Sequence, residues 1–150
     1  MAENSPVNRS ELMSRIGSRD TAPELVVRRS LHAIGYRYRL HVRTLPGTPD
    51  VVLPRYKAVI FVHGCFWHCH PGCRHFRLPK SNRGFWKEKL NRNVERDREQ
   101  VAQLRRMGWR VLTVWECATR ENPIEKLVDN ISQWLHSTNV LAQIPESQRI

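Results

Sequence analysis

Residues 50–73, DVVLPRYKAVIFVHGCFWHCHPGC, decide the fold, because they join two short apolar runs to a dense group of Cys and His residues. The apolar runs at 50–53 and 58–62 are separated by PRYK at 54–57, and a polar tetrapeptide that contains proline is typical of a turn. Short apolar runs bounded by turn residues are characteristic of buried strands. The stretch therefore predicts an antiparallel hairpin.

The register of this hairpin determines which side chains share a face. If Leu53 pairs with Ala58, then Asp50 lies opposite Phe61 and on the same face as His63. A carboxylate and a histidine at the end of a buried strand pair can hold Mg²⁺ and assist attack on a phosphodiester. Spacing alone equally allows Asp50 to cap the preceding turn, because Pro-Asp is a common turn dipeptide.

Two further titratable residues are candidates for the same chemistry. His68 follows the hairpin and can be a general base, a spare zinc ligand or a solvated loop histidine. Glu24 stands three residues after Thr21 in a capping box, where a glutamate needs no catalytic role. The residues alone leave both alternatives open.

The Cys and His residues after the hairpin have the composition of a structural zinc site. Thiolate and imidazole are the ligands that tetrahedral zinc prefers, and a structural site closes with four of them. The four candidates that fit best are Cys65, His70, Cys73 and Cys117, because neighbouring Cys69 and His70 can hardly both turn inward in a tight loop. The alternative is a group of small buried thiols without a metal. We favour zinc, which would tie this loop to the strand before Cys117.

Helix and strand patterns extend on both sides of the hairpin. Apolar spacing and capping residues predict a short helix over 9–16 and longer helices over 22–34, 84–107 and 123–135. Alternation or apolar runs predict strands over 36–40 and 109–115. With the hairpin, the main order is α, β, β, β, α, β, α. This order predicts an α/β (mixed α+β) fold with a central mixed sheet flanked by helices. Residues 137–150 are expected to form a flexible tail.

Length and charge limit the function classes. A chain of 150 residues is expected to form a single domain, 1–150, and 25 Lys and Arg against 14 Asp and Glu give a net charge of +11. A domain this basic is expected to bind a polyanion, with nucleic acid before a membrane surface. The longest apolar run is too short to span a bilayer, and the N-terminus has no signal-like apolar region. We therefore expect a reducing, cytoplasmic setting.

Two aromatic pairs lie in segments that are rich in charged residues. Phe66-Trp67 lies within the Cys/His loop, and Phe85-Trp86 lies where the long helix begins. Core packing is the default for an aromatic residue, and Trp109 and Trp115 in the predicted strand fit it. Rings in basic loops are better placed to stack on bases or to wedge between them.

Four motifs resemble the very short patch repair endonuclease family, which nicks DNA beside T:G mismatches. They are PGTPD, FVHGCFWHCH, FWKEKLNRNVERD and GWRVLTVWEC, and the resemblance runs from about residue 8 to residue 134. It implies a restriction-endonuclease-like fold, a structural zinc and Mg²⁺-dependent hydrolysis. The implied reaction is a nick 5′ of the thymine in a T:G mismatch in duplex DNA.

The resemblance also implies roles for individual residues. Asp50 corresponds to the metal-binding aspartate, His68 to the general base, His63 to a second active-site histidine and Glu24 to an acidic residue of the first long helix. Val62 stands where we expect threonine and would offer Mg²⁺ its backbone carbonyl. Because no second acidic residue lies on the second hairpin strand, Mg²⁺ is expected to bind tightly only with DNA.

The remaining implied roles concern zinc and DNA. The zinc ligands correspond to Cys65, His70, Cys73 and Cys117, and the intercalating residues to Phe66, Trp67, Trp86 and Met13, the last within an N-terminal DNA-contacting arm at 1–19. We expect a monomeric bacterial protein that is associated with the nucleoid, uses Mg²⁺ and Zn²⁺, and works with mismatch-repair proteins. The alternatives are a non-catalytic zinc-stabilised DNA-binding module and a metal-dependent RNA nuclease.

Overall fold

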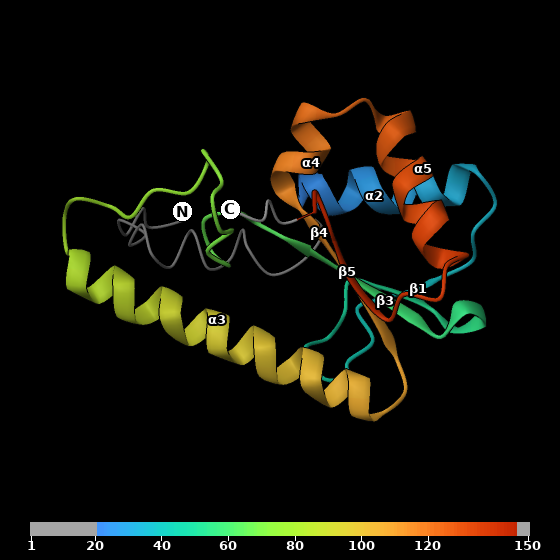
Figure 1. Ribbon diagram of the computed structural model, residues 1–150, viewed down its shortest axis with the longest axis horizontal. Coiled ribbons are helices and arrows are strands. Elements are labelled where there is room, and N and C mark those ends of the chain that lie inside the picture. The colour runs from blue at the N-terminus through green and yellow to red at the C-terminus, as the bar shows by residue number, and fades with distance from the viewer. Residues whose placement is uncertain (1–20, 147–150) are drawn as a thin grey trace, which may run out of the picture.

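The strands of the protein form one mixed sheet with helices on both of its faces (Figure 1). The structure is a computed structural model in which residues 21–146 are described. The elements are α2 (Ala22–Ala33), β1 (Arg39–Leu40), β2 (Val51–Leu53), the 3-10 helix η1 (Pro54–Tyr56), β3 (Ala58–His63), α3 (Arg83–Arg106), β4 (Arg110–Trp115), α4 (Glu116–Glu121), α5 (Ile124–Leu135) and β5 (Leu141–Ile144).

The hairpin at the centre of the sheet has the predicted register. The strand order is β1-β2-β3-β4-β5, with antiparallel pairs from β1 to β3 and parallel pairs from β3 to β5. Leu53 pairs with Ala58, as expected, and Lys57 closes the connection with a left-handed backbone (φ 51°). Because side chains alternate along a strand, Phe61 and His63 share one face of the sheet. Asp50 precedes β2 at the end of this pair.

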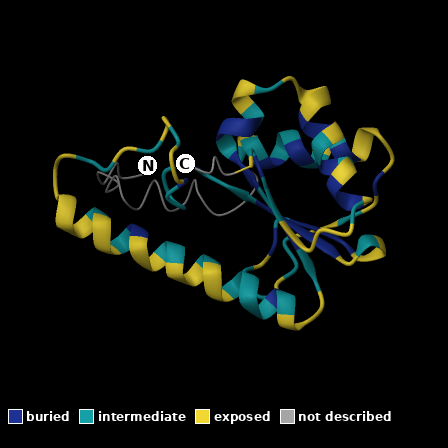
Figure 2. Cartoon of the chain, viewed as in Figure 1, coloured by how far each residue is buried: buried dark blue, intermediate teal, exposed yellow. Residues whose placement is uncertain are grey.

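The two faces of the sheet are covered unequally. Helices α2, α4 and α5 lie together on one face, where the larger hydrophobic core forms, and α3 lies on the other (Figure 1). The smaller core beneath α3 contains Val52, Val59, Phe61, Leu104 and Val111. In α3 only Leu90 and Leu104 are buried, and its N-terminal half extends past the sheet with most side chains exposed (Figure 2). The second face is therefore partly open beside the carboxyl end of β3.

Three features differ from the sequence-based predictions. The prediction of a flexible tail over residues 137–150 is wrong for Leu141–Ile144, which form β5 and pair in parallel with β4. The strand predicted over 36–40 contracts to Arg39–Leu40, and a six-residue helix, α4, follows β4 without a break. The short helix predicted over 9–16 lies outside the described residues. Within residues 21–146, no helix is long and apolar enough to cross a membrane.

Arg110, at the start of β4, caps the C-terminal end of α5. Its guanidinium donates hydrogen bonds to the carbonyl oxygens of Trp134 (2.6 Å), Leu135 (3.1 Å), Ser137 (3.0 Å) and Asn139 (3.1 Å). We expect Arg110→Met to lower the free energy of unfolding by about 3 kcal/mol, because several helix-end carbonyls lose their donor. Urea denaturation measures this change. Arg106→Met, at a side chain that is 68% exposed, is the matched control and should cost less than about 0.5 kcal/mol.

Candidate active site and metal-binding cluster

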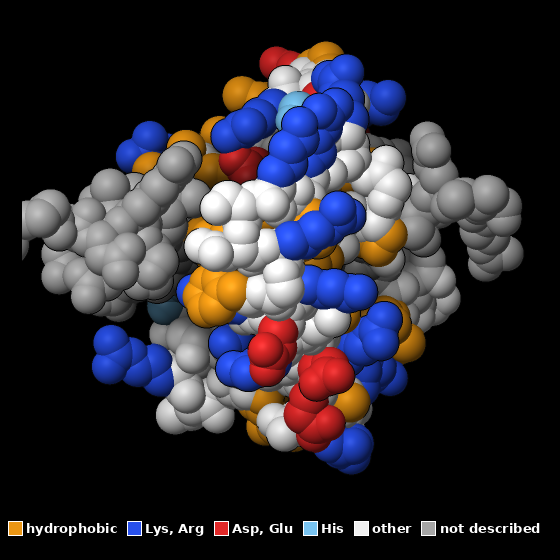
Figure 3. Space-filling model, turned by 90° about the vertical axis from the view of Figure 1, so that its left-hand side faces the viewer, with side chains coloured by type: hydrophobic (Ala, Val, Ile, Leu, Met, Phe, Trp, Pro, Cys, Tyr) orange, Lys and Arg blue, Asp and Glu red, His pale blue; other side chains and the backbone are white. Residues whose placement is uncertain are grey.

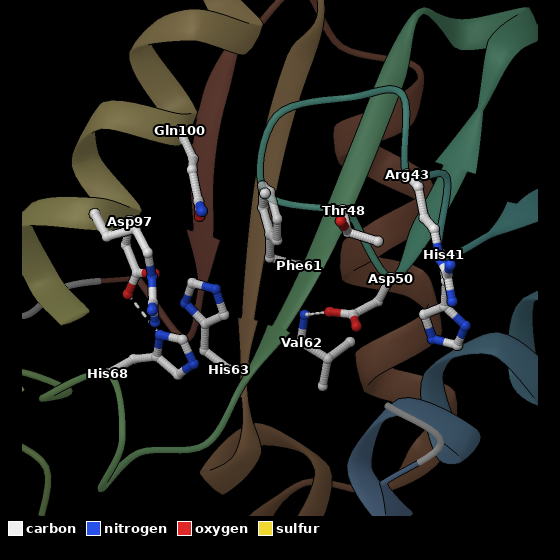
Figure 4. A pocket seen from close by; sticks show the side chains of 12 residues that line it. His41, Arg43, Thr48, Asp50, Phe61, Val62, His63, His68, Asp97 and Gln100 are labelled. Atoms are coloured by element: carbon white, nitrogen blue, oxygen red, sulfur yellow. Dashed lines mark hydrogen bonds and ion pairs between the residues drawn. The ribbon is translucent and has the colours of Figure 1, made fainter. Parts of the chain in front are cut away.

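A cavity of about 800 Å³ opens on the partly covered face of the sheet. It is lined by the loop before β2, the carboxyl end of β3 and the middle of α3. Figure 4 shows its two ends: Asp50 and His41 lie at one end, and His63, His68 and Asp97 lie at the other, with Phe61 and Val62 of β3 between them. The cavity therefore brings carboxylates and imidazoles from separate parts of the chain around one polar space.

Asp50 is held at the floor of this cavity by the backbone of β3. Its Oδ2 accepts a hydrogen bond from the backbone N–H of Val62 at 2.7 Å (Figure 4). Burial and, to a smaller extent, the carboxylate of Glu24 together raise the pKa of Asp50 to about 8, although the hydrogen bond from Val62 acts in the opposite direction. Two carboxyl groups in contact without solvent favour a shared proton, or a cation in its place.

Glu24 is the second carboxylate of this pair, and it is almost fully buried, with 1% of its side chain exposed. The predicted N-cap is present, because Thr21 Oγ1 accepts a hydrogen bond from the Glu24 N–H at 3.4 Å. The Glu24 carboxylate meanwhile lies 2.7 Å from the Arg28 guanidinium and 2.8 Å from His41 Nε2. Glu24 thus combines a place in the capping turn with a place beside Asp50.

The opposite end of the cavity contains two histidines and an aspartate. The rings of His63 and His68 are stacked with their centroids 3.7 Å apart and their planes within 5°. Asp97 of α3 lies 2.5 Å from His68 Nδ1, which fixes the ring and leaves Nε2 on its opposite side (Figure 4). Burial, followed by electrostatic repulsion from the neighbouring His68 and Arg96 side chains, holds the pKa of His63 well below its usual range. His63 is therefore neutral at physiological pH.

The four predicted zinc ligands come together behind this end of the cavity. The ligand atoms of Cys65, His70, Cys73 and Cys117 all lie within 4.8 Å of one another, and His70 Nδ1 is 3.6 Å from Cys65 Sγ and 3.5 Å from Cys117 Sγ. Sulfur and nitrogen atoms around one tetrahedral zinc are separated by about 3.5–3.8 Å, so the set fits the ion. Cys69 is outside the cluster, as predicted. The cluster joins the loop after β3 to the start of α4.

The predicted base-stacking residues also form one group. Phe66, Trp67 and Trp86 lie in edge-to-face or tilted contact, with centroids 5.0–5.9 Å apart. Lys89 Nζ lies 5.6 Å from the Trp67 ring and 5.7 Å from the Trp86 ring. In Figure 3, Lys and Arg side chains run down the face where α3 begins, beside exposed hydrophobic side chains. Aromatic rings within a basic surface suit nucleic-acid bases and phosphates.

The structure thus places most sequence-based candidates around the cavity or beside it. Trp115 is buried and Trp109 is partly buried, as expected for core residues. Met13 and the predicted DNA-contacting arm over 1–19 lie outside the described residues. Two residues of the site were not predicted, namely Asp97 and His41. Asp97 had a signal, because it is an acidic residue within the apolar stripe of α3, whereas His41 had none.

Comparison with known proteins gives a consistent result. The family model for DNA mismatch endonuclease Vsr matches residues 2–74. The chain is 52% identical over 113 residues to the type II nicking enzyme V.XorIIP of Xanthomonas oryzae pv. oryzae, covering 75% of this chain and 82% of the relative. It is 43% identical over 139 residues to the DNA mismatch endonuclease Vsr of Escherichia coli K12, covering 91% and 88%. It is also 44% identical over 116 residues to the type II nicking enzyme V.NmeAIP of Neisseria meningitidis, covering 77% and 82%.

Proposed function

Because the chain belongs to the Vsr family of DNA mismatch endonucleases, we propose that it nicks duplex DNA 5′ of the thymine in a T:G mismatch by Mg²⁺-dependent hydrolysis. The family implies the restriction-endonuclease-like fold, and the mixed sheet flanked by helices agrees with it. One observation supports the reaction most directly. A buried carboxylate pair faces an imidazole–carboxylate pair across a single cavity.

Magnesium fits the carboxylate end of this cavity. Asp50 is buried against Glu24, and Mg²⁺ prefers oxygen ligands and shares its coordination with phosphates and water. Asp50 and the backbone carbonyl of Val62 would hold the ion. When bound, the ion neutralises negative charge on the phosphate. The side chains then have the tasks of placing the phosphate and of moving a proton.

The histidine end of the cavity supplies the route for that proton. Asp97 fixes His68 through Nδ1, so Nε2 is the atom that takes a proton from the attacking water. Neutral His63 stacks on the same ring and prevents it from tilting away. Asp97 also stabilises the imidazolium that forms when His68 accepts the proton.

The aromatic group and the basic surface support mismatched duplex DNA as the substrate. Phe66, Trp67 and Trp86 would enter the base stack beside the mismatch, with Met13 wedging from the other side. Unstacking costs a few kcal/mol per step and is cheaper at a mismatch, which gives selectivity before any base is recognised. Contacts of Lys and Arg with phosphates should make binding strongly dependent on salt.

The cysteine cluster would hold a structural Zn²⁺. Burial and the neighbouring thiols of Cys65 and Cys73 raise the pKa of Cys117. Three crowded thiols and an imidazole are a donor set that zinc stabilises by binding the thiolates. We expect the protein to be a monomer in the bacterial cytoplasm, associated with the nucleoid and with mismatch-repair proteins.

Nicking of synthetic duplexes tests the proposed reaction. Duplexes with T:G, A:C, T:C and no mismatch are incubated with the protein and Mg²⁺, and both strands are followed on a denaturing gel. We expect one nick, 5′ of the mismatched thymine, and no cut in the matched duplex. Binding to the T:G duplex without a nick at any Mg²⁺ concentration would support the non-catalytic module instead. Faster cleavage of a matched RNA hairpin would support the RNA nuclease.

The contact between Asp97 and His68 predicts a specific kinetic defect. We expect Asp97→Asn to lower kcat for T:G nicking about 10²-fold with little change in KM, because the His68 ring loses its negatively charged partner. Single-turnover nicking over a range of enzyme concentrations separates the two parameters. Glu95→Gln, at an exposed position two residues away on α3, is the matched control. Equal losses in both variants would remove Asp97 from the mechanism.

A further inference from the structure

His41 occupies a place in the cavity that the proposed hydrolysis does not use. It follows β1 with a left-handed backbone (φ 47°), which is uncommon for any residue other than glycine. Its backbone N–H donates to the Asp50 carbonyl at 3.3 Å, so its backbone is fixed next to Asp50. The ring is thereby directed at Glu24, with Nε2 2.8 Å from Oε1. Strained backbone that positions a ring on a buried carboxylate commonly marks a functional site.

The positions of the three side chains suit a single cation. One ligand atom each from Glu24, His41 and Asp50 lie within 4.8 Å of one another. Ligand atoms of one octahedral divalent ion lie about 3 Å apart when adjacent and about 4.2 Å apart when opposite. Small rotations of the side chains would therefore suffice to bring all three atoms onto one ion. His41 and Asp50 both line the open cavity, which gives an ion a route from solvent (Figure 4).

The nitrogen donor determines which ion this set prefers. Mg²⁺ is a hard cation that binds oxygen, whereas imidazole favours first-row transition metals. The site has two carboxylates and one imidazole but no thiolate, so the cysteine cluster is the stronger of the two for Zn²⁺ and fills first when zinc is limiting. We propose that Glu24, His41 and Asp50 form a cation site with His41 Nε2 as a ligand, and that this site binds Mn²⁺ or Co²⁺ more tightly than Mg²⁺.

This inference rests on the proposed function in one respect, because Asp50 is a ligand in both. It adds His41 to the donor set and changes the preferred ion. The rival explanation is that His41 only donates a hydrogen bond to Glu24 and holds it in place. The two explanations differ in whether a bound metal contacts the nitrogen of His41.

Electron spin resonance of Mn²⁺ distinguishes these explanations without using activity. Zinc-loaded full-length protein is titrated with Mn²⁺ in the absence of DNA, and Mg²⁺ affinity is measured by displacement of Mn²⁺. We expect Mn²⁺ to bind at least about tenfold more tightly than Mg²⁺, and the electron spin echo to contain the modulation of a coordinated imidazole nitrogen. His41→Gln should remove the modulation and lower Mn²⁺ affinity about tenfold, with Mg²⁺ affinity changed less than about twofold.

Three further variants, compared with His41→Gln, make the result decisive. His32→Gln, at an exposed histidine of α2, is the matched control and should leave binding and modulation unchanged. A nitrogen modulation that survives His41→Gln and disappears in His63→Gln would place the ion at the histidine end of the cavity and overturn the proposal. Equal loss of Mn²⁺ and Mg²⁺ affinity in His41→Gln would also overturn it, because His41 would then only position Glu24. Asp50→Asn tests the proposed function separately from His41. If this variant binds both Mn²⁺ and Mg²⁺ as tightly as wild type, Asp50 is not a metal ligand.

Discussion

Asp50→Asn is expected to abolish nicking. In the zinc-loaded protein without Mg²⁺ it is also expected to increase the free energy of unfolding at pH 8. Loss of the carboxylate that we propose to hold Mg²⁺ would remove several kcal/mol of transition-state stabilisation, so the nicking rate should fall at least about 10³-fold. The gain in stability has a separate cause. Burial and the Glu24 carboxylate raise the pKa of Asp50 to about 8, so its ionised form is unfavourable in the folded protein.

The direction of the pH dependence follows from this pKa. In the unfolded chain the pKa of Asp50 is near 3.8, so between about pH 4 and pH 8 the folded state holds one proton more than the unfolded state. The contribution of protonated Asp50 is fully present below pH 4 and is lost as the pH rises through 8. An asparagine is neutral at every pH and can still accept the hydrogen bond from the Val62 N–H. The variant therefore does not lose this contribution.

Thermal denaturation of the zinc-loaded, Mg²⁺-free proteins at pH 6 and pH 8 measures the difference in stability between the variant and wild type. At pH 8 the asparagine variant should be more stable by on the order of 5 kcal/mol, which corresponds to roughly 10–20 °C in Tm. At pH 6, midway between the two pKa values of Asp50, the difference should be about half as large. Asp129→Asn, at an exposed position of α5, is the matched control and should shift neither Tm nor nicking. A variant that is less stable than wild type at pH 8 would contradict the burial of an ionisable Asp50.

Local patterns were sufficient to predict the elements that are large or strongly patterned. The hairpin register followed from two apolar runs and one short loop, and α3 followed from the spacing of Leu90, Val94, Val101 and Leu104. The β5 strand, LAQI, is only four residues long and is interrupted by a glutamine, so little in its own sequence predicts it. Its backbone is paired by the edge of β4, which supplies a tertiary contact that a local pattern does not contain.

The contrast between local patterns and tertiary contacts also explains which parts of the site were predicted. Cys65, His70 and Cys73 are close in sequence, so their residue types alone indicated a common site, which the structure brings together with Cys117. Asp97 is twenty-nine residues from His68, and the contact depends on how α3 crosses the sheet. An acidic residue three positions after Val94 and four before Val101 was nevertheless a signal of an inward carboxylate. For His41, the left-handed backbone that directs its ring leaves no trace in the sequence.

Removal of the proposed zinc ion from the cysteine cluster is expected to abolish nicking while most of the fold is retained. The cluster's buried core contains only Cys65, Trp115 and Cys117, whereas the main core between the sheet and α2, α4 and α5 is separate. The backbone hydrogen bonds within the loop that the cluster closes join residues only three to five positions apart, and the loop carries His68 as well as the pair Phe66-Trp67. Binding energy of about 10 kcal/mol from a structural zinc is large enough to order such a loop. Without it the loop should open locally.

Cys117→Ser and chelation of the wild-type protein both test this expectation. Nicking of the T:G duplex should fall at least about 10³-fold, since the proposed base and the aromatic wedge leave their positions together. Amide hydrogen exchange should lose protection at His68 and His70, whose N–H groups bond to Gly64 and Cys65 in the ordered loop. Protection in β3 and β4 should persist. Cys69→Ser removes a neighbouring thiol that lies outside the cluster, and it should leave metal content, exchange and nicking close to wild type. Loss of protection across the whole sheet would mean that the cluster supports the entire fold, and undiminished nicking would separate the cluster from the active site.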